Sequence, residues 1–127
     1  MEIKHDLYLG DCEDVLKIIP DNSVDLIFTS PPYADQRKKT YGGIHPDDYV
    51  EWFLPKTEQM LRVLKPTGTF VLNIKEKVVD SERSTYVMEL ILAMRKQGWL
   101  SAPLCNGANL TVSNGGRHEH AQRGFCR

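Results

Sequence analysis

Two apolar runs separated by a helical pattern constrain the fold of this chain most strongly. The first run, VDLIFTS at residues 24–30, is apolar almost throughout. Such a run is typical of a parallel strand that helices cover on both faces. The second run, TFVLNI, occupies 69–74, and residues 47–64 between them carry apolar side chains at helical spacing. The sequence therefore predicts an α/β fold with a partial doubly wound parallel sheet.

The rest of the first hundred residues continues this alternation. LYLG at 7–10 is a candidate short strand, and DCEDVLKIIP at 11–20 predicts a short helix with acidic residues in its first turn. Apolar spacing across 83–97 predicts a further helix, which Gly98 would end. Pro55 lies inside the long helical pattern, so we expect it to kink that helix or to split it.

Composition limits the class of protein. A chain of 127 residues is the length of one domain, and a net charge of -1 excludes binding to nucleic acid through an overall basic excess. Three widely spaced cysteines do not suggest a secreted disulfide framework, and no window approaches the ~20 apolar residues of a membrane span. We expect a cytoplasmic protein with no membrane partner.

Polar residues follow the predicted strands at three places. They are Gly10-Asp11, the segment Ser30 to Tyr33, and Asn73 to Lys75. In doubly wound sheets, ligands bind beyond the carboxyl ends of the strands. The sequence therefore predicts that these three segments meet at one rim of the sheet.

The segment Ser30-Pro31-Pro32-Tyr33 has the parts needed to activate a planar amino group. The serine hydroxyl and the Pro31 carbonyl are acceptors for its two N–H hydrogens, which frees the nitrogen lone pair to attack an electrophilic methyl group. The prolines fix the backbone and offer no competing donor. Tyr33 could stack on a base flipped out of a duplex. The alternative interpretation is an ordinary strand exit stopped by proline.

Longer stretches of the chain carry a family resemblance. LYLGDCEDVLKIIPDNSVDLIFTSPPY, YVEWFLP, RVLKPTGTFVLNIKEK and MRKQGW resemble, in order, the catalytic half of β-type (permuted) DNA methyltransferases of restriction-modification systems. The resemblance runs from about residue 5 to 100. It implies a Rossmann-like fold, S-adenosylmethionine as cofactor and double-stranded DNA as partner. A cognate restriction endonuclease would act without direct contact.

The resemblance also implies roles for single residues. Ser30, Pro31, Pro32 and Tyr33 correspond to the target-base site, and the serine form resembles enzymes acting on N4 of cytosine more than those acting on N6 of adenine. Asp11 corresponds to a cofactor-binding residue. Asp11 could equally be the N-cap of the helix that follows it, and the two roles are compatible.

The chain departs from the family in one element and in its last segment. The family's glycine-rich F-x-G-x-G turn does not occur in the sequence, and the resemblance stops near residue 100. We therefore expect residues 1–100 to be the catalytic half of a methyltransferase domain and 101–127 an unassigned tail, as a frameshift or gene rearrangement would produce. The chain would then be a truncated enzyme or an inactive remnant or binding module. A methyltransferase acting on adenine N6 or on RNA is a further alternative.

Two other clusters have a functional and a structural interpretation. The basic run Arg37 to Lys39 could contact DNA phosphates or simply be a solvated loop. Zinc ligands could be sought among four tail residues, but their spacing matches no standard zinc site, so we expect no metal. These residues are Cys105, His118, His120 and Cys126. Trp52 and Trp99 are interpreted as packing residues.

Overall fold

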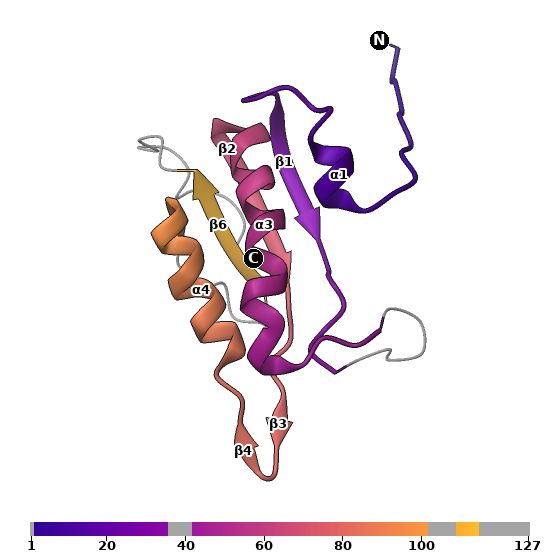
Figure 1. Ribbon diagram of the computed structural model, residues 1–127. Coiled ribbons are helices and arrows are strands. Elements are labelled where there is room, and N and C mark those ends of the chain that lie inside the picture. The colour runs from indigo at the N-terminus through magenta and orange to yellow at the C-terminus, as the bar shows by residue number, and fades with distance from the viewer. Residues whose placement is uncertain (1, 36–41, 102–108, 115–127) are drawn as a thin grey trace.

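The computed structural model describes residues 2–35, 42–101 and 109–114. In this part of the chain, strands form a four-stranded sheet in the order β1-β2-β6-β5. Strands β1 (Val24–Thr29) and β2 (Leu64–Asn73) are parallel, as predicted, and the long helix α3 (Pro46–Val63) connects them. Figure 1 shows α3 running alongside both strands.

The other half of the sheet is antiparallel. Strand β6 (Asn109–Asn114) lies between β2 and β5 (Trp99–Ser101), and it is antiparallel to both. Its residues belong to the segment beyond residue 100, in which the apolar pattern predicted no element. The boundary at residue 100 stays a prediction, while β6 shows that part of the tail joins the sheet.

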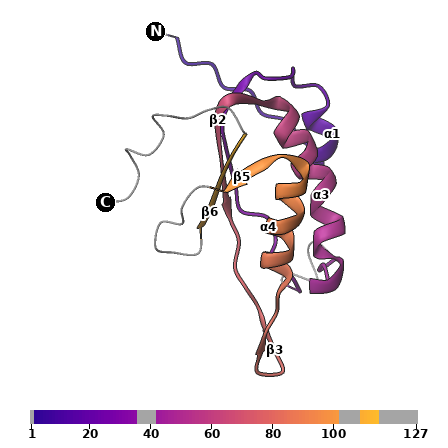
Figure 2. The same ribbon diagram turned by 90° about the vertical axis from the view of Figure 1, so that its left-hand side faces the viewer.

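Helices cover one face of this sheet. Helices α1 (Cys12–Leu16), α3 and α4 (Tyr86–Gln97) all lie on the same side, as the edge-on view in Figure 2 shows. Leu26 and Phe28 of β1 point to the opposite side and are 60% and 69% exposed. The predicted cover on both faces is therefore present on one face only in the described part of the chain.

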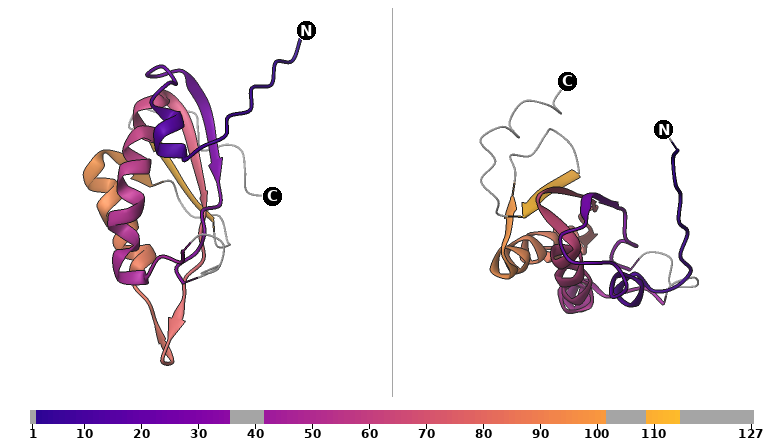
Figure 3. Two further views of the ribbon diagram at one scale, coloured as in Figure 1. Left: turned by 45° about the vertical axis from the view of Figure 1, so that its right-hand side comes forward. Right: turned by 90° about the horizontal axis from the view of Figure 1, so that it is seen from above.

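The strand predicted at residues 7–10 is wrong, and so is the split that was one of the two outcomes predicted for Pro55. Residues 7–10 form no strand, and Figure 3 shows the N-terminal segment extending away from the sheet. A strand is stable only when it pairs with a neighbour, and the pattern of a single segment cannot supply that neighbour. Pro55 neither splits nor ends α3, which is one helix of 18 residues. Pro55 and Glu51 are both exposed, so water can satisfy the carbonyl that loses its helical partner.

Glycine is required at two positions, one at the end of a helix and one within a strand. Gly98 has a φ of 114° and caps the end of α4, as predicted. Gly68 lies on β2, where a Cβ atom would come within 2.7 Å of the Leu64 side chain.

A short hairpin, β3 (Val78–Val79) and β4 (Glu82–Arg83), projects from the body between β2 and α4 (Figure 1).

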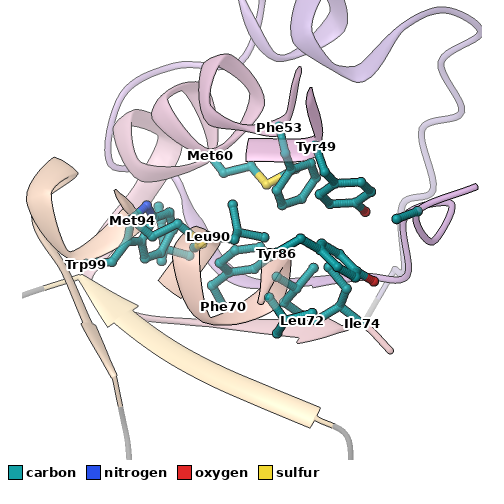
Figure 4. Packing of buried hydrophobic residues seen from close by; sticks show 13 residues of the cluster. Tyr49, Phe53, Met60, Phe70, Leu72, Ile74, Tyr86, Leu90, Met94 and Trp99 are labelled. Atoms are coloured by element: carbon teal, nitrogen blue, oxygen red, sulfur yellow. The ribbon is translucent and has the colours of Figure 1, made fainter. Parts of the chain in front are cut away.

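Aromatic side chains dominate the core between the helices and the sheet. Phe70 and Trp99 pack with ring centroids 4.9 Å apart, and Tyr49 contacts Phe53 and Tyr86 (Figure 4). The predicted inner face of α4 is confirmed, since Val87, Leu90 and Met94 are buried and Ile91 packs against the same cluster. Trp99 is 1% exposed and Trp52 packs beside the core, as expected for packing residues.

Candidate active site at the carboxyl ends of the parallel strands

The segment Ser30 to Tyr33 leaves the sheet at the carboxyl end of β1. Ser30 is exposed, Pro31 is buried, and Pro32 and Tyr33 are half-buried. The next residue, Ala34, is 1% exposed and belongs to the core. Pro31 and Ala34 therefore anchor the segment in the protein interior, while Ser30 remains exposed to solvent.

Ser30 has a partner on the neighbouring strand. The Asn73 side-chain amide, at the end of β2, donates a hydrogen bond to the Ser30 hydroxyl oxygen at 3.4 Å. Because β1 and β2 are parallel, their carboxyl ends lie at the same edge of the sheet. Two of the three predicted rim segments are thus brought together.

Two buried tyrosines hold the loops that follow these strands. The Tyr49 hydroxyl, from the first turn of α3, donates to the Pro32 carbonyl oxygen at 2.8 Å. The Tyr86 hydroxyl, from the start of α4, donates to the Lys75 carbonyl oxygen. Sequence analysis missed both residues, because a tyrosine at an apolar helix position is interpreted as core. The signal that could have found them is that a buried tyrosine hydroxyl needs a partner.

The tyrosine pair stays protonated over a wide pH range. Burial raises the pKa of Tyr49 well above its ordinary value of 10.0, and burial likewise raises the pKa of Tyr86. Their rings meet edge to face, with centroids 4.9 Å apart. Both hydroxyls therefore act as hydrogen-bond donors throughout the neutral range.

Asp11 is the N-cap of α1, as one of its two predicted roles requires. Its side chain accepts a hydrogen bond from the Glu13 backbone N–H at 2.9 Å. The Lys56 ammonium, from the middle of α3, lies 3.9 Å from the Asp11 carboxylate and 3.3 Å from that of Glu13. Lys56 also lies over the Trp52 ring, 4.9 Å from its centroid. The role of Asp11 in cofactor binding stays a prediction.

The loop after the site is closed at its base. The Asp35 backbone N–H donates to the Ile44 carbonyl at 2.8 Å, and Lys77 forms an ion pair with the Asp35 side chain. The basic run Arg37 to Lys39 falls outside the described residues, as do the four tail residues considered as zinc ligands. Among the residues that the structure describes, no helix combines the length and the apolar character that a membrane span requires.

Comparisons with known proteins place this chain in a family. Residues 24–107, which include the Ser30 to Tyr33 segment and Asn73, match the model of a family described as DNA methylase. The chain belongs to the DNA methylase family.

Individual relatives agree with the assignment. The chain is similar to the type II methyltransferase M.PvuII of Proteus hauseri, with 38% identity over 69% of this chain and 27% of the relative. It is also similar to M.BglII of Bacillus subtilis, with 42% identity over 59% of this chain and 21% of the relative. The chain thus spans about a quarter of the length of these relatives.

Solved structures confirm the fold class. The structure of PvuII DNA methyltransferase (cytosine-N4-specific) superimposes with a TM-score of 0.67 and 27% identity, covering 84% of this chain and 48% of that one. TTHA0409 of Thermus thermophilus, solved in complex with S-adenosyl-L-methionine, superimposes with a TM-score of 0.62 at 21% identity. It covers 84% of this chain and 51% of that one. The partial Rossmann-like α/β fold predicted from the sequence is therefore confirmed.

Proposed function

We propose that this chain forms the target-base side of a DNA methyltransferase that transfers a methyl group from S-adenosylmethionine to N4 of cytosine. The observation that carries the proposal is the contact of Ser30 with Asn73 at the carboxyl ends of two parallel strands. It supports a role for the serine of the Ser-Pro-Pro-Tyr segment in a site at this edge of the sheet. The cytosine-N4 specificity of the PvuII enzyme supports the choice of base.

The chemistry follows from the acceptors that the site presents. A hydroxyl oxygen has two lone pairs, and the Asn73 amide takes one of them. The other lone pair of Ser30 can accept one N–H of an exocyclic amine, and the Pro31 carbonyl can accept the second. Hydrogen bonds from both N–H groups to these acceptors concentrate electron density on the nitrogen, which makes it a better nucleophile. Tyr33 would stack on the flipped base.

S-adenosylmethionine would supply the electrophilic methyl group. The residues present fit part of a site for it. Asp11 is exposed and its carboxylate has acceptor capacity beyond the cap bond to Glu13, so it could accept from a ribose hydroxyl. The sequence contains no F-x-G-x-G turn, which is the element expected to let backbone approach the cofactor closely. We therefore propose that the chain alone binds the cofactor weakly.

The uncovered face of the sheet supports the proposal that this chain forms the target-base side of the enzyme and binds the cofactor weakly by itself. Strand β1 is an edge strand, and its side chains Leu26 and Phe28 are exposed on the face that the described helices leave bare. Apolar side chains of this size at neighbouring positions mark a surface that other structure covers. We infer that the remaining elements of a DNA methylase, with the cofactor turn among them, would pack there.

The partners follow from the same site. Double-stranded DNA is the proposed substrate, and a cognate restriction endonuclease would act on the same sequence without contacting this chain. The basic run Arg37 to Lys39 would contact phosphates beside the flipped base. We propose the cytoplasm as the place of action, in agreement with the three unpatterned cysteines.

The decisive experiment identifies the methylated nucleoside. The chain is incubated with duplex DNA and methyl-labelled S-adenosylmethionine, and the DNA is digested for mass spectrometry. N4-methylcytosine is expected, with Ser30→Ala lowering its formation by about 100-fold. Ser23→Ala is the matched control, because Ser23 is also exposed and its hydroxyl bonds the Pro20 carbonyl in the turn before β1. N6-methyladenine as the sole product would contradict the choice of base.

The missing glycine-rich turn favours a second candidate function, a binding module without catalysis. Calorimetric titration with S-adenosylmethionine separates the two candidates. Weak binding accompanied by slow N4-methylcytosine formation supports the enzyme. No binding and no methylated product would support the non-catalytic module instead.

A further inference from the structure

Tyr49 contacts the Ser-Pro-Pro-Tyr segment from a distant part of the sequence. It lies in the first turn of α3, seventeen residues after Pro32, and it is fully buried. Its hydroxyl donates to the Pro32 carbonyl oxygen at 2.8 Å. The bond therefore joins a rigid element of the core to the backbone of the candidate site.

This hydrogen bond fixes the one free backbone angle in the second proline. The Pro32 ring already sets φ, so ψ decides the orientation of the Pro32–Tyr33 peptide. Holding the Pro32 carbonyl sets that ψ angle. The Tyr49 hydroxyl thus helps to hold the peptide from which Tyr33, the proposed stacking residue, extends.

The same device operates on the neighbouring strand. The Tyr86 ring packs against the Tyr49 ring, and its hydroxyl donates to the Lys75 carbonyl, two residues beyond Asn73. Figure 4 shows the two hydroxyls pointing toward the same end of the core. The segments that follow Ser30 and Asn73 are therefore tied to one pair of packed aromatic side chains.

We propose that Tyr49 is a positioning residue of the methyltransferase site, which holds the Pro32–Tyr33 peptide so that the base-stacking ring and the amine-accepting groups keep a fixed relative position. Tyr86 does the same for the end of β2. This inference rests on the proposed function for its chemical purpose. The contact that it invokes is structural and can be measured separately.

The first test measures position directly, without activity. In the full chain, Tyr49→Phe removes only the hydroxyl, and nuclear magnetic resonance records the Pro32 carbonyl carbon and the Tyr33 amide and ring signals. We expect these signals to move, while Tyr86→Phe, the matched control, moves those of Lys75 and Glu76. Unchanged Pro32 and Tyr33 signals in Tyr49→Phe would overturn the inference.

A measurement on the unsubstituted chain covers the case in which Tyr49→Phe does not fold. A buried, hydrogen-bonded tyrosine hydroxyl exchanges its proton slowly with water. We expect a resolved Tyr49 hydroxyl signal with a nuclear Overhauser contact to Tyr33. Rapid exchange of that proton, with no such contact, would equally overturn the inference.

Kinetics then connects position to chemistry. Where the unsubstituted chain methylates DNA, Tyr49→Phe should lower kcat by about tenfold and leave the KM for S-adenosylmethionine unchanged, because one positioning hydrogen bond is lost and no cofactor contact. A higher KM with unchanged kcat would contradict positioning. An inactive unsubstituted chain with an intact Tyr49–Pro32 contact would instead count against the proposed function and leave the positioning contact established.

Discussion

The two faces of the β1–β2 ladder differ in what covers them. On one face, Phe70 and Leu72 are fully buried beneath α3 and α4. On the other face, Leu26 and Phe28 are equally apolar and are mostly exposed. Successive side chains of a strand point to opposite faces, so one strand carries both environments. Apolar character in a strand therefore reports which surface is suited to burial, and packing decides whether that burial stabilises this chain.

The largest expected effect comes from the covered face. Phe70→Ala should lower the free energy of unfolding by about 3–5 kcal/mol, because it removes a buried ring that contacts Trp99 and leaves a cavity. Urea denaturation followed by circular dichroism measures it. Phe28→Ala, the same change on the bare face, should shift the free energy by less than about 0.5 kcal/mol. Equal losses would show that the two faces are buried alike.

Alkaline pH should lower the free energy of unfolding through the buried tyrosines of the covered face. The pKa of Tyr49 is raised in the folded chain, so the unfolded chain loses this proton first as the pH rises past 10.0. The stability is fully present below that pH and falls above it, by about 1.4 kcal/mol for each pH unit. Urea denaturation below and above pH 10 measures the slope. Tyr49→Phe should reduce that slope, and an unchanged slope would assign the loss to other groups.

The attachment of α1 should depend on an ion pair as well as on the packing of Leu16 against the core. Helix α1 has no fully buried residue, and the nearly buried Lys56 of α3 forms an ion pair with Glu13 at the start of α1 while its ammonium lies over the Trp52 ring of its own helix. Lys56→Met should cost about 1 kcal/mol, which urea denaturation detects. Lys17→Met is the control, since its ion pair with Asp14 is exposed and should contribute nothing measurable. A similar loss in both variants would argue against a special role of Lys56.

The smallest effect on stability is expected on the bare face. The double substitution Leu26→Thr and Phe28→Thr should leave the free energy of unfolding within about 0.5 kcal/mol, because both side chains are exposed and threonine favours strands. It should raise the concentration at which the chain stays monomeric, which light scattering measures. A large loss of stability would show that other parts of the chain cover this face.

Local patterns predicted much of the architecture and the central segment of the site. The apolar runs of β1 and β2, the helical spacing of α3 and α4, and the cap at Gly98 each depend on neighbours in sequence. Each of these features was predicted, although β2 begins at Leu64 rather than at residue 69. The Ser30 to Tyr33 segment was identified because its chemistry lies in consecutive residues. Family membership followed from the same stretches.

Features that depend on distant partners could not be predicted. The β6 strand needs β2 and β5 beside it, and residues 7–10, which have a strand-like pattern, form no strand. A backbone ladder is stable only with a neighbour, and a one-dimensional pattern does not name that neighbour. Pro55 was tolerated because its side of α3 faces solvent, which also depends on tertiary packing.

The amino-acid order was enough to predict the family, the fold class and the proposed target-base segment. The first two depend on the short-range spacing of apolar residues and on motifs, and the third on functional groups in adjacent residues. Only the tertiary structure decided which groups hold that segment. They are Asn73, which bonds Ser30, and Tyr49, which bonds Pro32. These contacts join residues 43 and 17 positions apart. The first contact arises because β1 and β2 pair in parallel, and the second because the crossover helix packs its aromatic face onto the sheet. No local pattern along the chain contains that information.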